Sequence, residues 1–470
     1  MARITPRRIA NTTTILAALL ATTLPGGCEK EPQAAAKPAI KKHNVLLVTL
    51  DTTRADRMSC YGHSAKTSPN MDALAADGVR FDMAIAQAAL TPVSHASIFT
   101  GLLPPQHGLR VLYAKSGYRL SEAIPTLATA LRDQGWKTGA FLSSFPVSEF
   151  FGFDNGFETF DNGLRHPSDD VLKESPDGAW RFAITDNQRR SDLTTSLAIN
   201  WLSDITSPFY LWVHYWDPHD LNIRPPEEVM SKFAPPGSPP SDDKRRALYD
   251  SEIFYVDLQF GRLVQTLKDR SIYDDTIIVV VSDHGEGLGN HDHWFHRILY
   301  QEQIRVPLIM RLPGGPTGRA VSELVRTTDI YPTVLAALNI PLPSRVDGLS
   351  MLGLIDGQPE EPRIAYADAL ILYDLNAKDL LDRRPNDDLL HCVMDRSWKL
   401  IYKPNRPEQS ELYHLETDPG ETKNLYAQQS EQAARLQSEL EELNAFVDGP
   451  FGEGTDEDVL DRLRSLGYVE

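Results

Sequence analysis

Two short apolar runs, far apart in the chain, each end in side chains of the kind that bind metal ions. Residues 44–50 and 276–282 are aliphatic, rich in β-branched side chains and as long as a buried strand. Asp51 follows the first run, and Asp283 and His284 follow the second. In open sheets that alternate with helices, ligands bind beyond the carboxyl ends of the strands. The pattern therefore indicates a site for a divalent cation at one edge of a sheet, although a single aspartate after a strand is also a common turn residue.

A third segment, residues 90–101 (LTPVSHASIFTG), predicts a short helix with a hydroxyl group at its start. Thr91 is a good N-cap residue, Pro92 suits the first helical position, and Gly101 can end the helix in the left-handed conformation. Alone, this pattern is typical of an ordinary helix cap. A nucleophile at this place would also receive oriented backbone N–H groups and the positive end of the helix dipole, both of which favour an anion.

From about Asn44 to its C-terminus the chain resembles the sulfatase family, within the alkaline-phosphatase-like superfamily of metal-dependent hydrolases. The segments that carry the resemblance are residues 50–56 (LDTTRAD), 94–101 (SHASIFTG), 282–286 with 300–308 (SDHGE, YQEQIRVPL) and 411–421 with 424–425 (ELYHLETDPGE, NL). The resemblance implies an α/β fold with a large mixed, mostly parallel sheet flanked by helices and a small C-terminal antiparallel-sheet subdomain. The alternation of apolar strand and helix patterns along the chain favours the same architecture.

The resemblance also implies a metal centre with a nucleophile beside it. Asp51, Thr91, Asp283 and His284 would surround one divalent ion, of which Ca, Mg, Mn and Zn are all candidates. The ion would lower the pKa of the Thr91 hydroxyl and polarise an oxygen of a bound ester. Thr91 would then act as the nucleophile.

Departures from the family pattern bear directly on the reaction. Active sulfatases carry a cysteine, or in some members a serine, at the nucleophile position and convert it to formylglycine. Here Thr91 occupies that position, His95 stands where an arginine is expected, and Thr52 replaces a second metal-binding aspartate. Threonine cannot become formylglycine by that route, so we expect a plain hydroxyl nucleophile. A hydroxyl fits phosphate or phosphonate esters better than sulfate esters, since the extra hydroxyl of formylglycine serves to expel sulfate.

Three histidines are candidates for catalytic roles. His219 matches a family position that contacts the transferred group or leaving group, and His296 falls where the family often has a lysine or histidine beside the substrate. Either could serve as general acid because imidazole titrates near neutrality, although a lone histidine is often structural. His95 is the third candidate. Ser143 and Phe145 stand where many sulfatases carry a lysine and a histidine for the sulfate.

A second metal site is an alternative that the sequence leaves open. It would combine Asp217 and His219 with His291 or His293 in a histidine-rich stretch. The Asp-x-His spacing differs from the spacing usual for two-metal phosphatases of the superfamily. The single-metal arrangement is therefore favoured.

Other functions remain open beside phosphoester or phosphonate hydrolysis. The chain could be a true sulfuric ester hydrolase, a transferase that moves a phosphoryl headgroup through the same threonine ester, or a non-catalytic binding protein that kept the fold. The persistence of Asp51, Asp283 and His284 favours an enzyme. The expected substrate is a small-molecule, glycan or lipid ester.

Length and charge agree with a large enzyme. With 470 residues, 41% of them hydrophobic, the chain can bury a substantial core, and we expect a catalytic domain at residues 44–350 and a C-terminal subdomain at residues 351–470. The formal net charge of −18 argues against nucleic acid or anionic lipid as the main partner.

The N-terminal segment predicts export. Residues 1–27 combine three arginines with an apolar run and end before Cys28, a pattern close to a bacterial lipoprotein signal. We expect a lipid on Cys28, a tether at residues 28–43 and a place in the cell envelope, with periplasmic location or secretion as the alternative. The other two cysteines, Cys60 and Cys392, could form a disulfide, which the sequence alone does not decide.

Overall fold

The computed structural model describes residues 39–164, 187–206, 208–219, 223–374, 377–443 and 456–465. The expected signal segment, Cys28 and most of the expected tether lie outside these residues. Within the described ranges, no helix is both long enough and apolar enough to cross a membrane.

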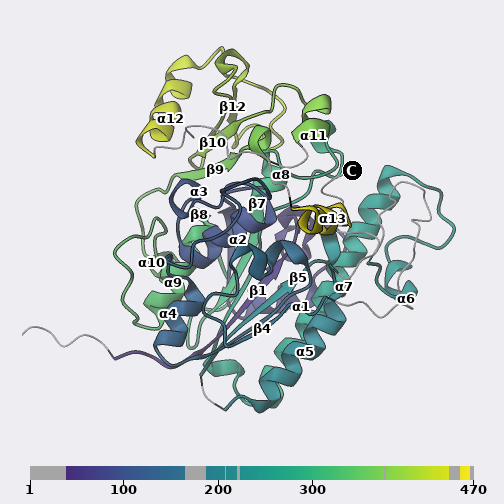
Figure 1. Cartoon of the computed structure of the whole chain (residues 1–470), viewed down its shortest axis with the longest axis vertical. Coiled ribbons are helices and arrows are strands. Elements are labelled where there is room, and N and C mark those ends of the chain that lie inside the picture. Colours follow the sequence, from purple (N-terminus) through teal and green to yellow (C-terminus); the bar gives the residue numbers. More distant parts are fainter. Residues whose placement is uncertain are drawn as a thin grey trace, which may run out of the picture. The chain divides into compact units, whose positions relative to one another are not determined.

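A large sheet forms the centre of the fold (Figure 1). It has eight strands in the order β4-β3-β5-β1-β6-β7-β2-β8. Its strands are β1 (Asn44–Leu50), β2 (Val79–Ile85), β3 (Lys137–Phe141), β4 (Thr159–Asp161), β5 (Phe209–Tyr215), β6 (Thr276–Ser282), β7 (Arg305–Arg311) and β8 (Arg319–Arg326). Neighbouring strands are parallel except at β7, which is antiparallel to both β6 and β2. The predicted large, mostly parallel sheet is confirmed.

Helices cover both faces of this sheet because its central strands are apolar on both sides. In β1, Val45 and Leu47 join a core with α2, α4 and α9, whereas Leu46, Val48 and Leu50 join a second core with α1, α5 and α7. The helices of the main domain are α1 (Pro69–Ala76), α2 (Thr91–Thr100), α3 (Pro104–His107), α4 (Leu127–Asp133), α5 (Ser191–Asp204), α6 (Glu227–Met230), α7 (Asp242–Asp269), α8 (Gln301–Ile304), α9 (Ile330–Ala337) and α10 (Leu352–Asp356). Such two-sided burial is expected for parallel strands.

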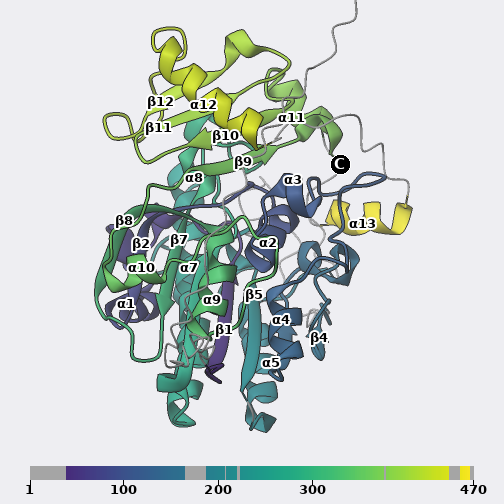
Figure 2. The same ribbon diagram turned by 90° about the vertical axis from the view of Figure 1, so that its left-hand side faces the viewer.

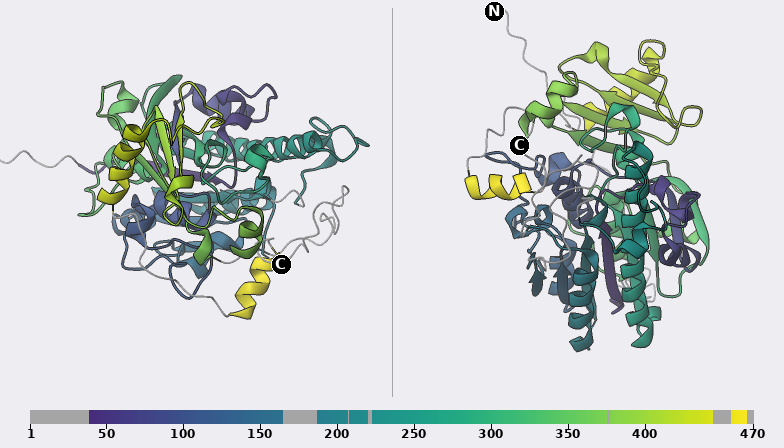
Figure 3. Two further views of the ribbon diagram at one scale, coloured as in Figure 1. Left: turned by 90° about the horizontal axis from the view of Figure 1, so that it is seen from above. Right: turned by 90° about the vertical axis from the view of Figure 1, so that its right-hand side faces the viewer.

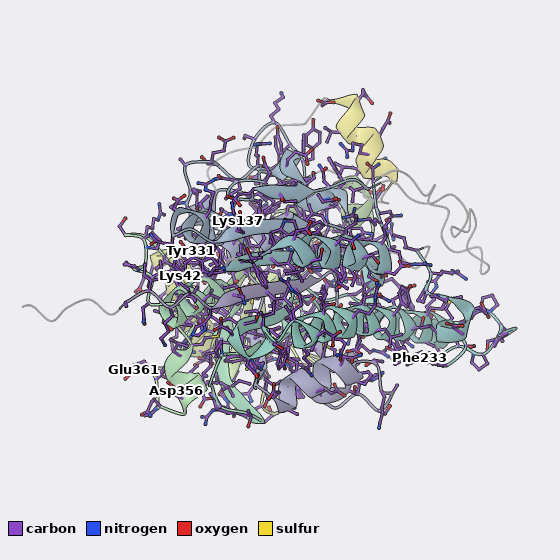
Figure 4. The ribbon with its side chains drawn as sticks, turned by 90° about the horizontal axis from the view of Figure 1, so that it is seen from below. Lys42, Lys137, Phe233, Tyr331, Asp356 and Glu361 are labelled. Carbon is purple, nitrogen blue, oxygen red and sulfur yellow. The ribbon has the colours of Figure 1, made fainter. Side chains whose placement is uncertain are left out.

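The longest helix, α7, begins where the Ser241 side chain accepts a hydrogen bond from the Lys244 N–H group at 3.1 Å. Its first half is accompanied by α6 and by Phe233, whose ring packs against Phe254 with 5.5 Å between the ring centroids (Figure 4). Its second half packs on the sheet through Phe260 and Leu263.

A second sheet of four antiparallel strands follows, in the order β12-β11-β10-β9 (Figure 2, Figure 3). Its elements are β9 (Ala365–Ala369), α11 (Ala377–Arg383), β10 (Leu390–Met394), β11 (Trp398–Tyr402), β12 (Glu411–His414) and α12 (Ser430–Glu442). The later helix α13 (Glu457–Ser465) packs instead in the core of the main domain, through Val459 and Leu463. One face of this sheet packs with Ile85 and Ile304 of the main domain. The other face packs under Leu436 and Leu440 of α12. The expected small C-terminal sheet is thus present.

The disulfide considered from the sequence is not formed, because Cys60 and Cys392 are both free thiols. Cys392 lies inside β10, in the core between the two sheets, whereas Cys60 packs against the α1 side of the main sheet.

A buried ion pair ties the small sheet to the main domain. Lys399 of β11 lies 2.6 Å from a carboxylate oxygen of Glu421, and both side chains are fully buried. The other oxygen of Glu421 accepts the backbone N–H group of Gln301, the first residue of α8, at 2.5 Å. Removal of either side chain would leave the other as an unpaired buried charge, which would strongly lower the stability of the fold.

Replacement of Lys399 by methionine should therefore lower the free energy of unfolding by about 3–5 kcal/mol, because Glu421 would keep a buried charge without its cation. Adding Glu421→Gln removes that charge while keeping an oxygen for Gln301, and should recover most of the loss. Urea denaturation of the single and double variants measures both values. A double variant no more stable than Lys399→Met would contradict this account of the pair.

His107, at the end of α3, is a buried neutral imidazole. Its Nε2 atom lies 3.1 Å from the Ser97 hydroxyl, and its Nδ1 atom accepts the Leu109 N–H group at 3.2 Å. Burial, with a smaller contribution from Arg110, lowers the pKa of His107 from 6.5 to about 3. The folded protein therefore holds this ring neutral over a pH range in which the unfolded chain takes up a proton.

Because the folded pKa is depressed, the stability that His107 contributes is present above about pH 6.5 and is lost as the pH falls towards 3. Its share of the slope is up to about 1.4 kcal/mol per pH unit. The variant His107→Gln cannot titrate, so its free energy of unfolding, measured by denaturation from pH 7.5 to 4.5, should fall less steeply than that of the wild type. Equal slopes in the two proteins would show that His107 does not carry this proton uptake.

Candidate active site and metal centre

The carboxyl ends of β1 and β6 meet at one edge of the main sheet. Leu50 and Ser282 are paired in the parallel register, so the residues that follow them are neighbours. One ligand atom each from Asp51, Asp283 and His284 lies within 4.8 Å of the others, and all three residues are fully buried. We call these residues the Asp51 cluster. The structure thus brings together the three residues that the strand ends single out in the sequence.

Each carboxylate of the Asp51 cluster has one oxygen held by protein donors and one without a partner. Oδ1 of Asp283 accepts the N–H groups of Thr52 at 3.2 Å and His284 at 2.7 Å, and Oδ2 of Asp51 lies 3.2 Å from Nε2 of His214. Oδ1 of Asp51 and Oδ2 of Asp283 are buried and have no hydrogen-bond partner among the described residues.

Charge makes this arrangement unfavourable without a cation. Burial, followed by repulsion from Asp283, raises the pKa of Asp51 well above its usual value, and burial likewise raises the pKa of Asp283. A divalent cation would neutralise both carboxylates and satisfy both partnerless oxygens. The donor set of two carboxylates and one imidazole therefore fits such an ion.

Thr52 stands beside this cluster in a strained conformation. Its φ angle is 47°, in the left-handed region, which a β-branched residue rarely adopts. The Tyr249 hydroxyl donates to the Thr52 carbonyl at 2.6 Å, and the Thr52 N–H group points at Asp283. The Thr52 hydroxyl oxygen is another buried atom without a hydrogen-bond partner in the described part of the chain. Backbone strain of this kind is common where a turn is shaped by a ligand site.

Thr91 lies at the start of α2, one position further into the helix than the sequence predicts. The residue before the helix is Leu90, so Thr91 is the first helical residue rather than the N-cap, and no side-chain cap is formed. The prediction of an N-cap was wrong because the Thr91 hydroxyl is engaged elsewhere. It hydrogen-bonds the Asp51 carboxylate and lies 3.3 Å from Nε2 of His284. Gly101 ends the helix with a φ of 67°, as predicted.

His284 is held in one orientation. Its Nδ1 atom donates to the Gly285 carbonyl at 2.9 Å, which leaves Nε2 as the acceptor atom that faces Thr91. The imidazole nitrogen available for a metal ion and the Thr91 hydroxyl are therefore adjacent.

His95 is buried one turn into α2 and links Thr91 to the sheet. Its Nδ1 atom lies 2.8 Å from the Thr91 carbonyl and 3.6 Å from Oδ2 of Asp283. Its Nε2 atom lies 3.1 Å from the Thr49 hydroxyl, which also accepts the Trp212 indole N–H at 2.9 Å. Burial lowers the pKa of His95 to about 3, so the ring is neutral. These contacts suit a positioning residue better than one that touches substrate.

His219 and His296 form a row of imidazoles that ends at His284. The ring centroids of His296 and His284 are 4.6 Å apart, and those of His296 and His219 are 5.1 Å apart. His219 stacks on Trp216 at 3.7 Å. Burial lowers the pKa of both His219 and His296 well below the usual value, so both rings are neutral before an anion binds.

Two residues near the site were not singled out from the sequence. Glu286 lies 3.4 Å from Nδ1 of His296, and burial raises the pKa of Glu286 to about 8. His214, which contacts Asp51, lies within the otherwise apolar strand β5. A polar residue in such a strand is the one signal that could have marked His214, because β5 runs beside β1 with His214 opposite Thr49.

The second metal site considered from the sequence is not assembled. Asp217 accepts three hydrogen bonds from Ser191 at the start of α5, the shortest of them 2.6 Å from the Ser191 hydroxyl. His291 pairs with Glu302 at 2.7 Å, and His293 contacts the His296 carbonyl. Throughout the described ranges, the Asp51 cluster is the only group of three or more histidine, cysteine, aspartate or glutamate side chains close enough to hold an ion.

The positions expected to replace the family's sulfate ligands are structural. The Ser143 hydroxyl lies 2.8 Å from that of Thr194, and Phe145 belongs to the core beside α2. Neither side chain supplies a positive charge for an anion.

Comparison with known proteins finds relatives over most of the chain. Residues 43–340 match the family model described as Sulfatase, and residues 289–446 match the model described as N-sulphoglucosamine sulphohydrolase, C-terminal. The chain is 26% identical to the N-acetylglucosamine-6-O-sulfatase of Bacteroides thetaiotaomicron, over 92% of this chain and 90% of that protein. It is also 26% identical to the choline-sulfatase of Rhizobium meliloti, over 82% of each chain.

Solved structures share the fold. The phosphonate monoester hydrolase of Agrobacterium radiobacter superimposes with a TM-score of 0.67 at 24% identity, over 86% of this chain and 95% of that one. A 2-O glycosaminoglycan sulfatase, BT1596, superimposes with a TM-score of 0.68 at 18% identity, over 88% of this chain and 98% of that one. Since the Sulfatase model matches more than half of the sequence, the chain belongs to the sulfatase family and is an ester hydrolase.

Proposed function

We propose that this protein hydrolyses phosphate or phosphonate esters with Thr91 as its nucleophile. The observation that carries the proposal is the position of the Thr91 hydroxyl, at the first turn of α2 and in contact with Asp51 and His284. Sulfatases that use formylglycine have that residue at the corresponding position. A threonine there keeps a nucleophilic oxygen but lacks the second hydroxyl through which a sulfate adduct is expelled.

A divalent cation on Asp51, Asp283 and His284 would lower the pKa of a neighbouring hydroxyl and polarise an ester oxygen. Its fit rests on the two partnerless carboxylate oxygens of the cluster. The chain's own residues supply the remaining steps.

In the first step, Oγ1 of Thr91 forms a bond to phosphorus while the bond from phosphorus to the leaving alcohol breaks. The hydroxyl proton passes to the Asp51 carboxylate, to which the hydroxyl is hydrogen-bonded, because Nε2 of His284 would be occupied by the cation. The N–H groups of the first turn of α2 and the helix dipole stabilise the anionic phosphoryl group. Because His219 and His296 are neutral in the free protein, one of the two rings would take up a proton as the anionic ester binds and would then give it to the departing oxygen.

In the second step, water attacks phosphorus and gives a proton to the imidazole that protonated the leaving alcohol. The bond from phosphorus to Oγ1 breaks, and Oγ1 takes back the proton held by Asp51, which restores the Thr91 hydroxyl. His95 keeps the start of α2 in register throughout, because it joins the Thr91 carbonyl to Thr49 of β1.

Sulfate ester hydrolysis is the second candidate, and the relatives favour it. The N-acetylglucosamine-6-O-sulfatase and the choline-sulfatase are both named for sulfate substrates. With threonine as nucleophile, a sulfated intermediate would have to be released by direct attack of water. We therefore expect turnover of sulfate esters to be slower than turnover of the matching phosphate or phosphonate.

The nucleophile is tested by assay of the purified protein on aryl phosphate, phosphodiester, phosphonate and sulfate with added divalent metal. Thr91→Ala should lower kcat/KM by roughly 10³-fold or more, whereas Thr91→Ser keeps a hydroxyl and should stay within about tenfold. Thr100→Val, which removes a hydroxyl at the other end of α2, is the matched control. Undiminished turnover in Thr91→Ala would contradict the assignment of Thr91 as the nucleophile.

Metal binding is tested without any turnover. A ligand present at about 100 times its Kd stabilises the folded protein by about 2.7 kcal/mol, so a divalent cation should raise the melting temperature of the wild type. Asp283→Asn should abolish the rise. Asp217→Asn alters another buried aspartate, one already bonded to Ser191, and should keep the rise. An equal rise in the wild type and Asp283→Asn would place the ion elsewhere.

A further inference from the structure

His214 lies on the face of β5 that packs towards α2. Side chains two positions apart in a strand share a face. Tyr210 and Trp212 belong to the core that contains α2, so His214, the next residue in this series, lies on the same face. The strand register pairs His214 with Thr49 of β1, and Asp51 follows Thr49 by two residues. The imidazole is therefore a diagonal neighbour of Asp51, within reach of a side-chain contact.

The contact between the two side chains is a hydrogen bond. Nε2 of His214 lies 3.2 Å from Oδ2 of Asp51, and neither side chain is exposed. Burial, with a smaller contribution from His95, lowers the pKa of His214 well below its usual value, so the ring is neutral. A carboxylate can only accept hydrogen bonds. An ionised Asp51 therefore requires that the single ring proton of His214 be on Nε2, from which it is donated to Oδ2.

The other ring nitrogen of His214 has no comparable contact. Nδ1 is buried and has no hydrogen-bond partner in the described part of the chain. A lone pair that is buried in this way costs free energy. An apolar side chain would fill the same space without that cost. The hydrogen bond to Asp51 is therefore the feature that calls for a histidine at this position.

Aromatic neighbours fix the plane of the His214 ring. Its centroid lies 5.2 Å from that of His95 and 6.3 Å from those of both Trp212 and Trp216. His95 and Trp212 are themselves hydrogen-bonded to the Thr49 hydroxyl, at 3.1 and 2.9 Å. The imidazole is thus enclosed by side chains that are held in place, and it keeps Nε2 directed at the carboxylate.

This hydrogen bond makes the two oxygens of Asp51 unequal. Oδ2 faces His214, whereas Oδ1 is buried and has no hydrogen-bond partner among the described residues. As long as His214 donates to Oδ2, Oδ1 is the oxygen left for a cation. A carboxylate that gives one oxygen suits a small ion such as Mn²⁺. The larger Ca²⁺ takes about six to eight oxygen ligands and often binds both oxygens of one carboxylate.

We infer that His214 is a positioning residue for the cation, because it holds Oδ2 of Asp51 and makes this carboxylate a ligand through Oδ1 alone. The consequence is selectivity, since the site prefers Mn²⁺ over Ca²⁺ by more than it would without this hydrogen bond. His214 acts through Asp51 and is not itself a ligand. The inference rests on the metal centre of the proposed function but on no step of the reaction.

The test compares His214→Gln with His214→Met, two side chains of equal length. The amide nitrogen of glutamine can take the place of Nε2 and donate to Asp51, whereas methionine has no donor. The full chain, freed of metal with a chelator, is titrated separately with Mn²⁺ and with Ca²⁺ by isothermal titration calorimetry. Both Kd values are thus measured without any substrate.

His214→Met should weaken the binding of Mn²⁺ by roughly 10- to 100-fold, as is typical when the partner of a metal ligand is lost. It should weaken the binding of Ca²⁺ by less than about threefold, because the released Oδ2 can join that ion. His214→Gln should keep both Kd values within about threefold of the wild type. Rescue by glutamine separates positioning of Asp51 from mere filling of the core.

His391→Met is the matched control. His391 is another buried, neutral imidazole, whose Nδ1 atom lies 3.2 Å from the Tyr366 hydroxyl in the small sheet. Its replacement should leave both Kd values unchanged. If His214→Met fails to fold by circular dichroism, His214→Asn, which also lacks a donor at the place of Nε2, carries the comparison. Equal losses of Mn²⁺ affinity in the glutamine variant and the variant without a donor, or an unchanged ratio of the two Kd values in the latter, would overturn the inference.

Turnover assays on the same proteins separate this inference from the proposed function. Selective Mn²⁺ binding that depends on a donor at position 214, in a protein that cleaves no ester, would contradict the proposed function alone. Thr91-dependent turnover in a protein whose His214 variants all bind Mn²⁺ as the wild type does would overturn the inference alone. A wild type that binds neither ion would overturn the inference together with the metal centre.

Discussion

Two buried carboxylates at adjoining strand ends, Asp51 and Asp283, are the constraint on which the site depends. The negative charge of one carboxylate makes ionisation of the other less favourable. Among the described ion pairs, both contact only histidines and no lysine or arginine. The backbone of Thr52 and His284 fixes one oxygen of Asp283, and His214 faces one oxygen of Asp51. What remains are two oxygens that only a cation would satisfy together.

The packing of helices on both faces of the main sheet makes the burial of these two carboxylates possible. Its central strands β1 and β6 are apolar on both faces, so helices seal them from water on each side. The same burial that stabilises the fold removes the solvent that would otherwise screen the carboxylates. Burial by the flanking helices therefore both stabilises the sheet and strengthens the electrostatic interactions at its edge.

In the proposed function, Thr91 decides which reaction the family fold performs in this chain. The hydroxyl is placed by the start of α2, and His95 fixes that start to Thr49 of β1. The relatives are named for sulfate esters, but the residue at the nucleophile position lacks the chemistry by which formylglycine expels sulfate. The side chain at the centre of the site is thus a stronger guide to the reaction than overall similarity.

Sequence reasoning could locate the Asp51 cluster because Asp51, Asp283 and His284 each directly follow a strand, and parallel strands deliver their ends to one edge. It could not place the α2 boundary to the residue, because the Thr91 hydroxyl bonds to Asp51 from a strand distant in the chain. Glu286 was not singled out for a similar reason, and His214 was marked only by being a polar residue in the apolar strand β5. Each acts through a partner that only the folded chain brings near.

The most direct test of the account is to trap the covalent intermediate. Rapid mixing with a phosphate or phosphonate ester, acid quench and peptide mass spectrometry should find the transferred group on Thr91, on the peptide that contains residues 90–101. The adduct should form and decay at rates consistent with turnover. Turnover without any adduct, or an adduct on another residue, would contradict the account.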